Sequence, residues 1–468
     1  MRAGFAEREY TPAEGPIPGQ IKGHYGKGKI TPLMAHAAVI ESRGVYAALV
    51  SFDIIFFTVD FANALRERIS KAVKIPTDNI MLHTTHTHTG CETDVRCWGC
   101  PANPAALIPV ADAAVQAVIA AYEQMDEVKM GSARTYESRF SFCRDFFTTD
   151  GRIVTNPGNV PPEQLVGPIS DIDQSVNVIR FDSMEGKPLC FVVNYADHLD
   201  TNAHPDKFDA DYAGHLRLAL RREYGRDVVV VFLNGCCGNI NHIDFKSQSH
   251  KKTHIFPKTY SCMLIGEGLA DTIKKMSPAP MPREGDILIQ GRYCTFPTAR
   301  RYATPERKEW AKKFLAHLEA EGLMEEHKYS HDRQCAEMYL EEDADKTPRM
   351  MDIGVHVLQI GDTVFVGLPG EIYSKIGLKI KALSPFPNTV VVELADGWHG
   401  YIATDDVLRA GCYESIYSNI SYTGLGTADV LVDGAVTMLK GMYEAHIEHA
   451  MGEIRDNRIF NRKAESRS

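Results

Sequence analysis

The sequence lacks the features of a secreted or membrane-inserted chain. Residues 1–12 hold no apolar run preceded by basic residues, so neither a secretory signal nor a cleavage site is predicted. The most apolar stretches, 47–57 and 106–122, are too short or too interrupted to predict a span of a bilayer. We therefore expect a cytoplasmic protein with no transmembrane segment.

Basic charge is also scarce. The 468 residues include 51 lysines and arginines against 61 aspartates and glutamates, which gives a formal net charge of −10. This balance argues against a general nucleic-acid or anionic-membrane surface, and no nucleic-acid partner is expected. Internal repeats of fixed period and low-complexity tracts are absent from the sequence. The eleven cysteines are an odd number, and without a signal peptide we expect free thiols in a reducing cytosol.

Short apolar segments alternate with amphipathic ones, which predicts an α/β protein. The segment 227–233 does not alternate, so it is expected to be a strand buried on both faces. The other predicted strands are 47–57, 79–89, 352–360, 363–368 and 389–394. The predicted helices are 61–73, 106–124, 210–224, 262–276, 305–323 and 428–446.

One large domain, residues 1–450, is the expected organisation. Residues 300–350 are highly charged and predict a helical insertion, either a solvated surface helix or a lid over the core. Residues 451–468 form a polar C-terminal tail that is expected to fray. The sequence does not set the oligomeric state, and a homo-oligomer is compatible with it.

The strongest local signal is the segment HTTHTHTG, residues 83–90. Residues two apart on a strand share a face, so His86 and His88 are expected to project together beyond the strand end, where Gly90 breaks the pattern. Neutral imidazole is a good zinc ligand. One histidine here would be an ordinary surface residue, but a pair at a strand end predicts a zinc site.

Two histidines cannot close a catalytic zinc site, so further ligands must come from elsewhere. His198 follows the apolar run 189–193, and His204 competes with it for the same role. Glu371 follows a predicted strand and opens a helix, where it could equally be a favourable first-turn charge. The stretch 396–401 follows another strand. Sites in α/β sheets collect at such strand ends.

A glycine-rich turn, NGCCGNIN at 234–241, follows the buried strand. Its glycines let the backbone approach a ligand, and its amides could donate to an oxyanion, although a plain strand-to-loop turn is an equally good interpretation. Cys236 would be a nucleophile only if its thiolate were stabilised and exposed.

Two further cysteine features remain. Cys97 and Cys100 have the C-x-x-C spacing of redox and metal sites, but no second pair follows, so a dedicated role is the less favoured interpretation. Cys91 is expected to be a small buried residue beside the histidine segment.

These motifs, in this order, resemble those of the neutral/alkaline, non-lysosomal ceramidases. The similarity runs from residues 3–6 to about residue 414. The matching segments are His86 to Gly90 for H-T-H-[ST]-G, His198 followed by Asp211 to Gly214 for D-[YW]-x-G, Pro369 to Glu371 for P-G-E, and Gly400 to Thr404 with Tyr413-Glu414 for G-Y-x-x-T and Y-E.

The resemblance implies a mixed β-sheet core with flanking helices and a zinc-dependent hydrolase that cleaves an amide bond. The D-[YW]-x-G spacing favours His198 over His204. The implied zinc (Zn²⁺) ligands are His86, His198, Glu371 and Tyr401.

The same resemblance implies roles around the metal. His88 would pass a proton to the leaving amine, while Tyr413 and Arg144 would stabilise the charge that develops on the carbonyl oxygen. Gly235, Cys236 and Trp398 would line the substrate pocket.

The chain departs from that family in two ways. Gly235 stands where the family has a serine, and no immunoglobulin-like run of strands follows His446. We therefore expect a small N-acyl substrate rather than ceramide. The alternatives are a zinc hydrolase of an ester, lactam or other small acyl compound, and a non-catalytic metal-dependent binder. A scaffold protein fits less well, because it gives no reason for four strand-end ligand candidates.

Overall fold

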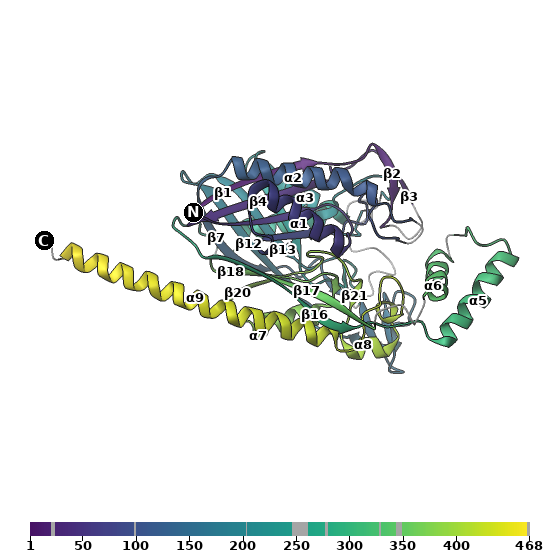
Figure 1. Cartoon of the computed structure of the whole chain (residues 1–468). Helices are drawn as coiled ribbons and strands as arrows, with labels where there is room; N and C mark the ends of the chain where they lie inside the picture. The colour runs from purple at the N-terminus through teal and green to yellow at the C-terminus, as the bar shows by residue number, and fades with distance from the viewer. Residues whose placement is uncertain are drawn as a thin grey trace.

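The protein folds into four layers, in the order helices, eight-stranded sheet, four-stranded sheet, helices (Figure 1). The computed structural model describes residues 1–19, 24–97, 100–202, 204–245, 261–276, 279–326, 329–342 and 349–465. The mixed sheets with flanking helices confirm the predicted fold class.

The larger sheet is mixed. Its parallel pairs are β13 with β14 and β5 with β6, and its other neighbours are antiparallel. In spatial order the strands are β14 (Val229–Asn234), β13 (Pro188–Tyr195), β12 (Ser175–Ser183), β7 (Asp126–Tyr136), β1 (Arg2–Glu9), β4 (Met34–Ser42), β5 (Val45–Phe52) and β6 (Ile80–Thr84).

Helices cover the outer face of this sheet in two pairs. One pair, α1 (Val59–Val73) and α2 (Leu107–Glu123), packs over β4 and β5, and the other, α3 (Asp211–Tyr224) and α4 (Ser261–Lys275), packs over β12 to β14. The inner face packs against the second sheet, so both faces are buried. This explains the apolar runs that do not alternate.

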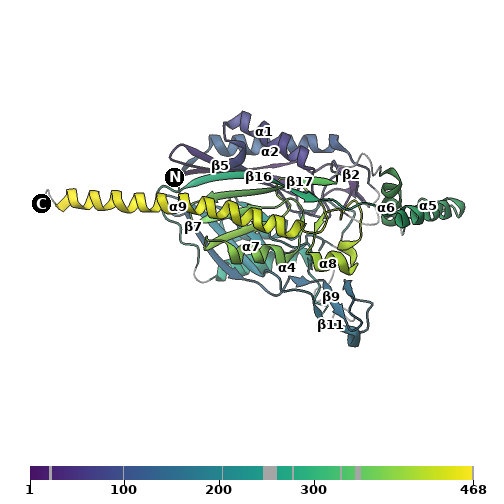
Figure 2. The same cartoon turned by 60° about the horizontal axis from the view of Figure 1, so that its bottom comes forward.

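The second sheet supplies the other half of the core. Its strands are β16 (Ile289–Ala299), β17 (Met350–Ile360), β18 (Thr363–Gly367) and β20 (Asn388–Val392), with β18 and β20 parallel. Leu358, Phe365 and Val390 face the larger sheet. The opposite face is covered by α7 (Ser374–Leu383) and α9 (Thr427–Glu465), which lie in front of it in Figure 2.

Short elements complete the chain. Two helices, α5 (Pro305–Ala320) and α6 (Ser330–Glu341), project from the body at the end opposite the C-terminus (Figure 1), so the predicted insertion is helical and its role as a lid stays a prediction. The remaining elements are β2 (Glu14–Ile17), β3 (His24–Lys27), β8 (Phe142–Cys143), β9 (Asp145–Thr148), β10 (Ile153–Thr155), β11 (Leu165–Pro168), β15 (Ile240–Asn241), β19 (Glu371–Ile372), β21 (Tyr401–Ile402) and α8 (Asp405–Ala410).

The largest differences in extent from the predictions are in β5, β6 and α9. The strands β5 and β6 end at Phe52 and Thr84, because the apolar and threonine-rich residues that follow are buried as loops rather than in a ladder. The last helix continues to Glu465, through most of the expected polar tail, since no proline interrupts it.

One described segment, Pro104–Glu123, is long and apolar enough to cross a membrane by length and composition. This differs from the expectation for 106–122. In the structure 56% of its most apolar window is buried, and α2 packs against β1 and β4.

The close approach of α2 to β1 predicts a sensitivity at Gly4. A Cβ on Gly4 would lie 1.8 Å from the carbonyl oxygen of Ala121 in α2, so an alanine forces the helix away from the sheet. We expect Gly4→Ala to lower the free energy of unfolding by about 1–3 kcal/mol, measured by urea denaturation. Gly167→Ala is the control, because a Cβ there meets nothing within 4 Å; equal stability of the two variants would contradict the packing.

Candidate metal centre

The polar residues singled out in the sequence meet where parallel strands of both sheets end. His86 follows β6, His198 follows β13, Glu371 follows β18, and Tyr401 follows β20. All four are at least 95% buried, with exposures of 1%, 1%, 3% and 5%. His204 lies apart and is exposed. The structure thus brings together four side chains that come from positions 86 to 401 of the chain.

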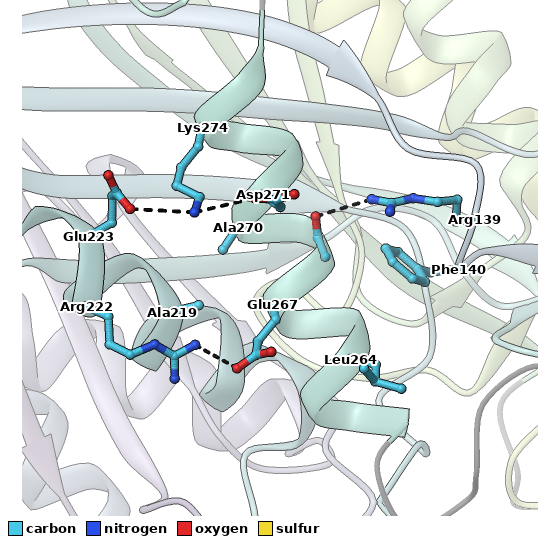
Figure 3. Close-up of a pocket in the computed structure, with 11 residues that line it drawn as sticks. Arg139, Phe140, Ala219, Arg222, Glu223, Leu264, Glu267, Ala270, Asp271 and Lys274 are labelled. Carbon is cyan, nitrogen blue, oxygen red and sulfur yellow. Dashed lines mark hydrogen bonds and ion pairs between the residues drawn. The ribbon is translucent and has the colours of Figure 1, made fainter.

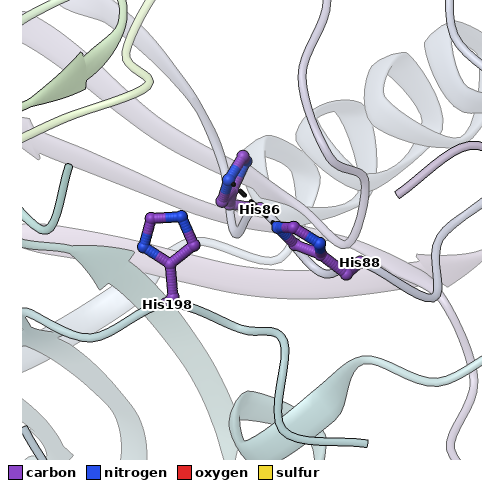
Figure 4. A group of neighbouring side chains, drawn as sticks. All are labelled: His86, His88 and His198. Atoms are coloured by element: carbon purple, nitrogen blue, oxygen red, sulfur yellow. Dashed lines mark hydrogen bonds between the residues drawn. The ribbon is translucent and has the colours of Figure 1, made fainter. Parts of the chain in front are cut away.

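Three imidazole rings, those of His86, His88 and His198, lie next to one another in this centre (Figure 4). The ring centroids are 4.9 Å apart for His86 and His88, 5.0 Å for His86 and His198, and 5.8 Å for His88 and His198. Each Nδ1 lies 2.7–3.0 Å from a backbone carbonyl oxygen. His86 contacts the carbonyl of Ile55, His88 that of Gly19, and His198 that of Cys237. These contacts place the proton on Nδ1, so that each Nε2 keeps a free lone pair.

His86 does not lie on a strand, contrary to the prediction for 79–89. It follows the end of β6 with a φ of 65°, in the left-handed region. This conformation is uncommon for a residue with a Cβ. The turn aims Nδ1 at the carbonyl of Ile55, in the loop after β5. The two histidines therefore converge through a turn and not through strand alternation.

The carboxylate of Glu371 lies between two of the imidazoles. Its Oε2 is 3.4 Å from Nε2 of His86 and 3.5 Å from Nε2 of His198. Its Oε1 accepts a hydrogen bond from the indole nitrogen of Trp398 (3.1 Å). Within the described part of the chain, Glu371 Oε2 and His198 Nε2 are buried without a hydrogen-bond partner. Buried polar atoms without partners are costly, and a cation between them would satisfy both.

Tyr401 reaches the same point because β19 and β21 pair in parallel, with Glu371 opposite Tyr401. The amide of Glu371 donates to the carbonyl of Gly400 (3.0 Å). The hydroxyl of Tyr401 accepts from Nη2 of Arg144 (3.1 Å), whose Nε donates to Glu414 (2.9 Å). Arg144 is thus a buried support for Tyr401, held in turn by a buried carboxylate.

His88 and Tyr413 are less buried than these four residues. The ring of Tyr413 lies 6.0 Å from that of Tyr401, and Nε2 of His88 lies 3.3 Å from Nε2 of His86. Both therefore stand next to the proposed ligands on their less enclosed side. Trp398 is buried, stacks on Phe56 with 4.1 Å between ring centroids, and acts on Glu371 through its hydrogen bond.

Burial and charge set the protonation of the centre. Burial, together with the neighbouring His86, lowers the pKa of His88 to about 3. Burial also opposes a charge on His86, yet the Glu371 carboxylate raises the pKa of His86 above its usual value. Although burial opposes it, the two imidazoles hold the pKa of Glu371 well below its usual range. The carboxylate is therefore ionised, and a bound cation would take the place of the additional proton that this carboxylate favours on His86.

Glu393, which the sequence did not single out, connects two ligand-bearing segments. Its Oε2 accepts the amides of Cys237 (2.9 Å) and Ile372 (2.8 Å), and its Oε1 accepts the thiol of Cys237 (2.8 Å). Cys237 holds His198 through its carbonyl, and Ile372 adjoins Glu371. One fully buried carboxylate thus fixes the distance between two proposed ligands.

The glycine-rich turn is structural in this arrangement. The amides of Gly235 and Gly238 donate to the carbonyls of Tyr195 and Ile372 (both 2.9 Å), so they are not available to an oxyanion. A Cβ on Gly235 would lie 2.9 Å from Cβ of Ala196. Cys236 packs in the core against α7, next to Gly377, and is not among the groups brought to the centre.

A concave surface lies on the outside of α3 and α4, away from the histidines (Figure 3). Its charged side chains pair with one another, as Arg222 does with Glu267 (2.7 Å) and Lys274 with Glu223 (3.5 Å). None of its lining residues belongs to the histidine cluster.

The Glu393 contacts predict a loss of stability. Glu393→Ala leaves two buried amides without acceptors, and we expect it to lower the free energy of unfolding by about 2–5 kcal/mol. Glu393→Gln keeps an acceptor oxygen and should lose less. Glu267→Ala, in an exposed ion pair, is the control and should change stability by about 1 kcal/mol or less. A Glu393→Ala variant as stable as this control would show that the contacts do not matter.

No family model and no curated protein matches the sequence. Solved structures do match the fold, among them two ceramidases. One, the neutral ceramidase from Pseudomonas aeruginosa, has a TM-score of 0.70 and 16% identity, and the match covers 95% of this chain and 74% of that chain. The other, a ceramidase complexed with C2, has a TM-score of 0.69 and 15% identity over 95% and 75% of the two chains. The chain therefore has a neutral-ceramidase-like fold.

Proposed function

We propose that this chain is a zinc-dependent hydrolase that cleaves a linear amide bond in a small N-acyl compound. The observation that carries the proposal is the placement of Glu371 Oε2 within 3.5 Å of two imidazole nitrogens, all of them buried at the strand ends. The fold neighbours, named as ceramidases, support an amide substrate.

The donor set fits zinc. Two neutral imidazoles, one carboxylate and one phenol are ligands of the kind that zinc takes in catalytic sites. Their protons are already directed, since Ile55 and Cys237 accept from Nδ1 of His86 and His198. When bound, zinc would acidify water and polarise a carbonyl group. His86, His198, Glu371 and Tyr401 would hold it.

The surrounding side chains have separate tasks. His88 is held through its Nδ1 by the carbonyl of Gly19, with the lone pair of Nε2 toward the centre, so it can take a proton from the attacking water and pass that proton to the leaving amine. The phenol of Tyr413, on the less enclosed side, would donate to a carbonyl oxygen as charge develops there. Arg144 would act through Tyr401, because it donates to that hydroxyl and to the carbonyl of Gly238.

Gly235 is the basis for proposing a substrate other than ceramide. The resemblance expects a serine here, and the 2.9 Å separation from Ala196 leaves no room for a side chain without a shift. Whatever a serine contributes to the reaction in ceramidases must be absent or supplied differently in this chain.

Histidine variants test the metal site and the proton donor separately. We expect His86→Ala and His198→Ala each to lose one equivalent of zinc and all measurable turnover, because each removes a ligand. His88→Ala should keep the zinc and lower kcat about 10²–10⁴-fold. The exposed His204→Ala is the control and should match the unaltered protein in metal content, measured by atomic emission, and in kcat.

The pattern would be contradicted if His88→Ala retained full kcat, which would remove its proton-donor role. It would also be contradicted if His86→Ala and His198→Ala retained all zinc.

A substrate panel tests the reaction class. The zinc-loaded protein should release amine from short N-acyl amines faster than from long-chain ceramide, with the rate lost on chelation and restored by zinc. Matched esters and lactams distinguish the neighbouring hydrolase functions. Binding of N-acyl compounds with no release of amine from any of them would instead indicate a metal-dependent binding protein.

A further inference from the structure

A second group of metal-binding side chains lies apart from the first. Asp209 lies just before α3, His215 lies in the second turn of α3, and Cys262 lies in the first turn of α4. Their ligand atoms all lie within 4.8 Å of one another. The exposed fractions are 0% for the Asp209 side chain, 13% for the His215 side chain and 6% for Cys262.

Two of these atoms have no partner. The Oδ1 of Asp209 accepts the amide of Thr31 (3.2 Å) and its hydroxyl. The other oxygen, Oδ2, and Nε2 of His215 make no hydrogen bond to any residue that the structure describes. They face each other at 4.0 Å, too far for a hydrogen bond. Zn–O and Zn–N bonds are about 2.0–2.2 Å long, so one ion reaches both atoms, and a small approach of the two side chains gives it tetrahedral angles.

The charge around Asp209 also favours a cation. Burial, together with the neighbouring carboxylate of Asp211, raises the pKa of Asp209 to about 8. Burial likewise raises the pKa of the Cys262 thiol, with Asp211 and Asp209 adding to the effect. A divalent ion reverses this balance, because it stabilises both the carboxylate and the thiolate.

We propose that Asp209, His215 and Cys262 hold a structural zinc ion, separate from the proposed catalytic one. The mixed oxygen, nitrogen and sulfur donors select a borderline-soft ion over calcium or magnesium. With three protein ligands, water completes the tetrahedron. The ion would join α3 to the start of α4 at a point where no covalent link exists.

This site is coupled to the histidine segment. The carbonyl oxygen of Asp209 accepts the hydroxyls of Thr87 (2.6 Å) and Thr89 (3.0 Å), and its amide donates to the carbonyl of Thr89 (3.1 Å). An ion that fixes Asp209 therefore also braces the turn that carries His86 and His88. The second ion would hold His86 and His88 in position at the first site, and it would not contact the substrate.

Cobalt distinguishes the two sites, because only the second contains sulfur. We expect the metal-free full chain to bind two equivalents of Co²⁺ and to show the near-ultraviolet absorption of a thiolate–cobalt bond. Cys262→Ala should lose that absorption and one equivalent. Cys294→Ala, which alters a thiol on β16, is the control and should lose neither.

The second metal site and the proposed hydrolase function can be tested independently of each other. His86→Ala combined with His198→Ala should retain one equivalent of Co²⁺ together with the sulfur absorption, whatever the enzyme's activity. If Cys262→Ala does not fold, His215→Ala on α3 gives the same readings. Persistence of the absorption in either variant, or binding of a single equivalent that the double histidine variant abolishes, would overturn the second site.

Discussion

The structure depends on one buried carboxylate placed between two imidazoles. Glu371, His86 and His198 are buried together, and no hydrogen bond among the described residues satisfies Glu371 Oε2 or His198 Nε2, which lie 3.5 Å apart. A cation between these side chains would offset the cost of burying the two atoms without partners. The burial of the site, the Nδ1 protons directed at carbonyl oxygens and the nearby phenol of Tyr401 are all consistent with our proposal of such an ion.

The fold meets this requirement by bringing two sheets together at the ends of parallel strands. His86 and His198 come from the eight-stranded sheet, while Glu371 and Tyr401 come from loops of the four-stranded sheet. The link between the halves is Glu393, which accepts an amide from the segment next to each of two ligands. Relative movement of the sheets would therefore break the ligand set, so packing between them is part of the chemistry.

Much of the fold could be predicted from the sequence, and so could the residues that meet at the candidate metal centre. The conformation and the contacts of those residues could not be predicted. Apolar runs indicated the strands, because burial on both faces leaves an uninterrupted pattern. The prediction that His86 and His88 share a strand face was wrong, since a left-handed φ at His86 is set by the loop around it. Glu393 gave no signal, because a lone glutamate at the end of a strand looks like any other. The sequence did not show whether Cys236 is exposed, because its burial depends on packing against α7, a distant segment of the chain.

The central claim is that a divalent ion lies between Glu371, His86 and His198. An anomalous difference map from crystals of the purified protein, recorded on both sides of the zinc absorption edge, tests it directly. The account predicts a strong peak within about 2.0–2.2 Å of His86 Nε2, His198 Nε2 and a Glu371 oxygen, present only above the edge. A zinc-replete crystal with no density at that point, and with Glu371 hydrogen-bonded to the two imidazoles instead, would contradict it.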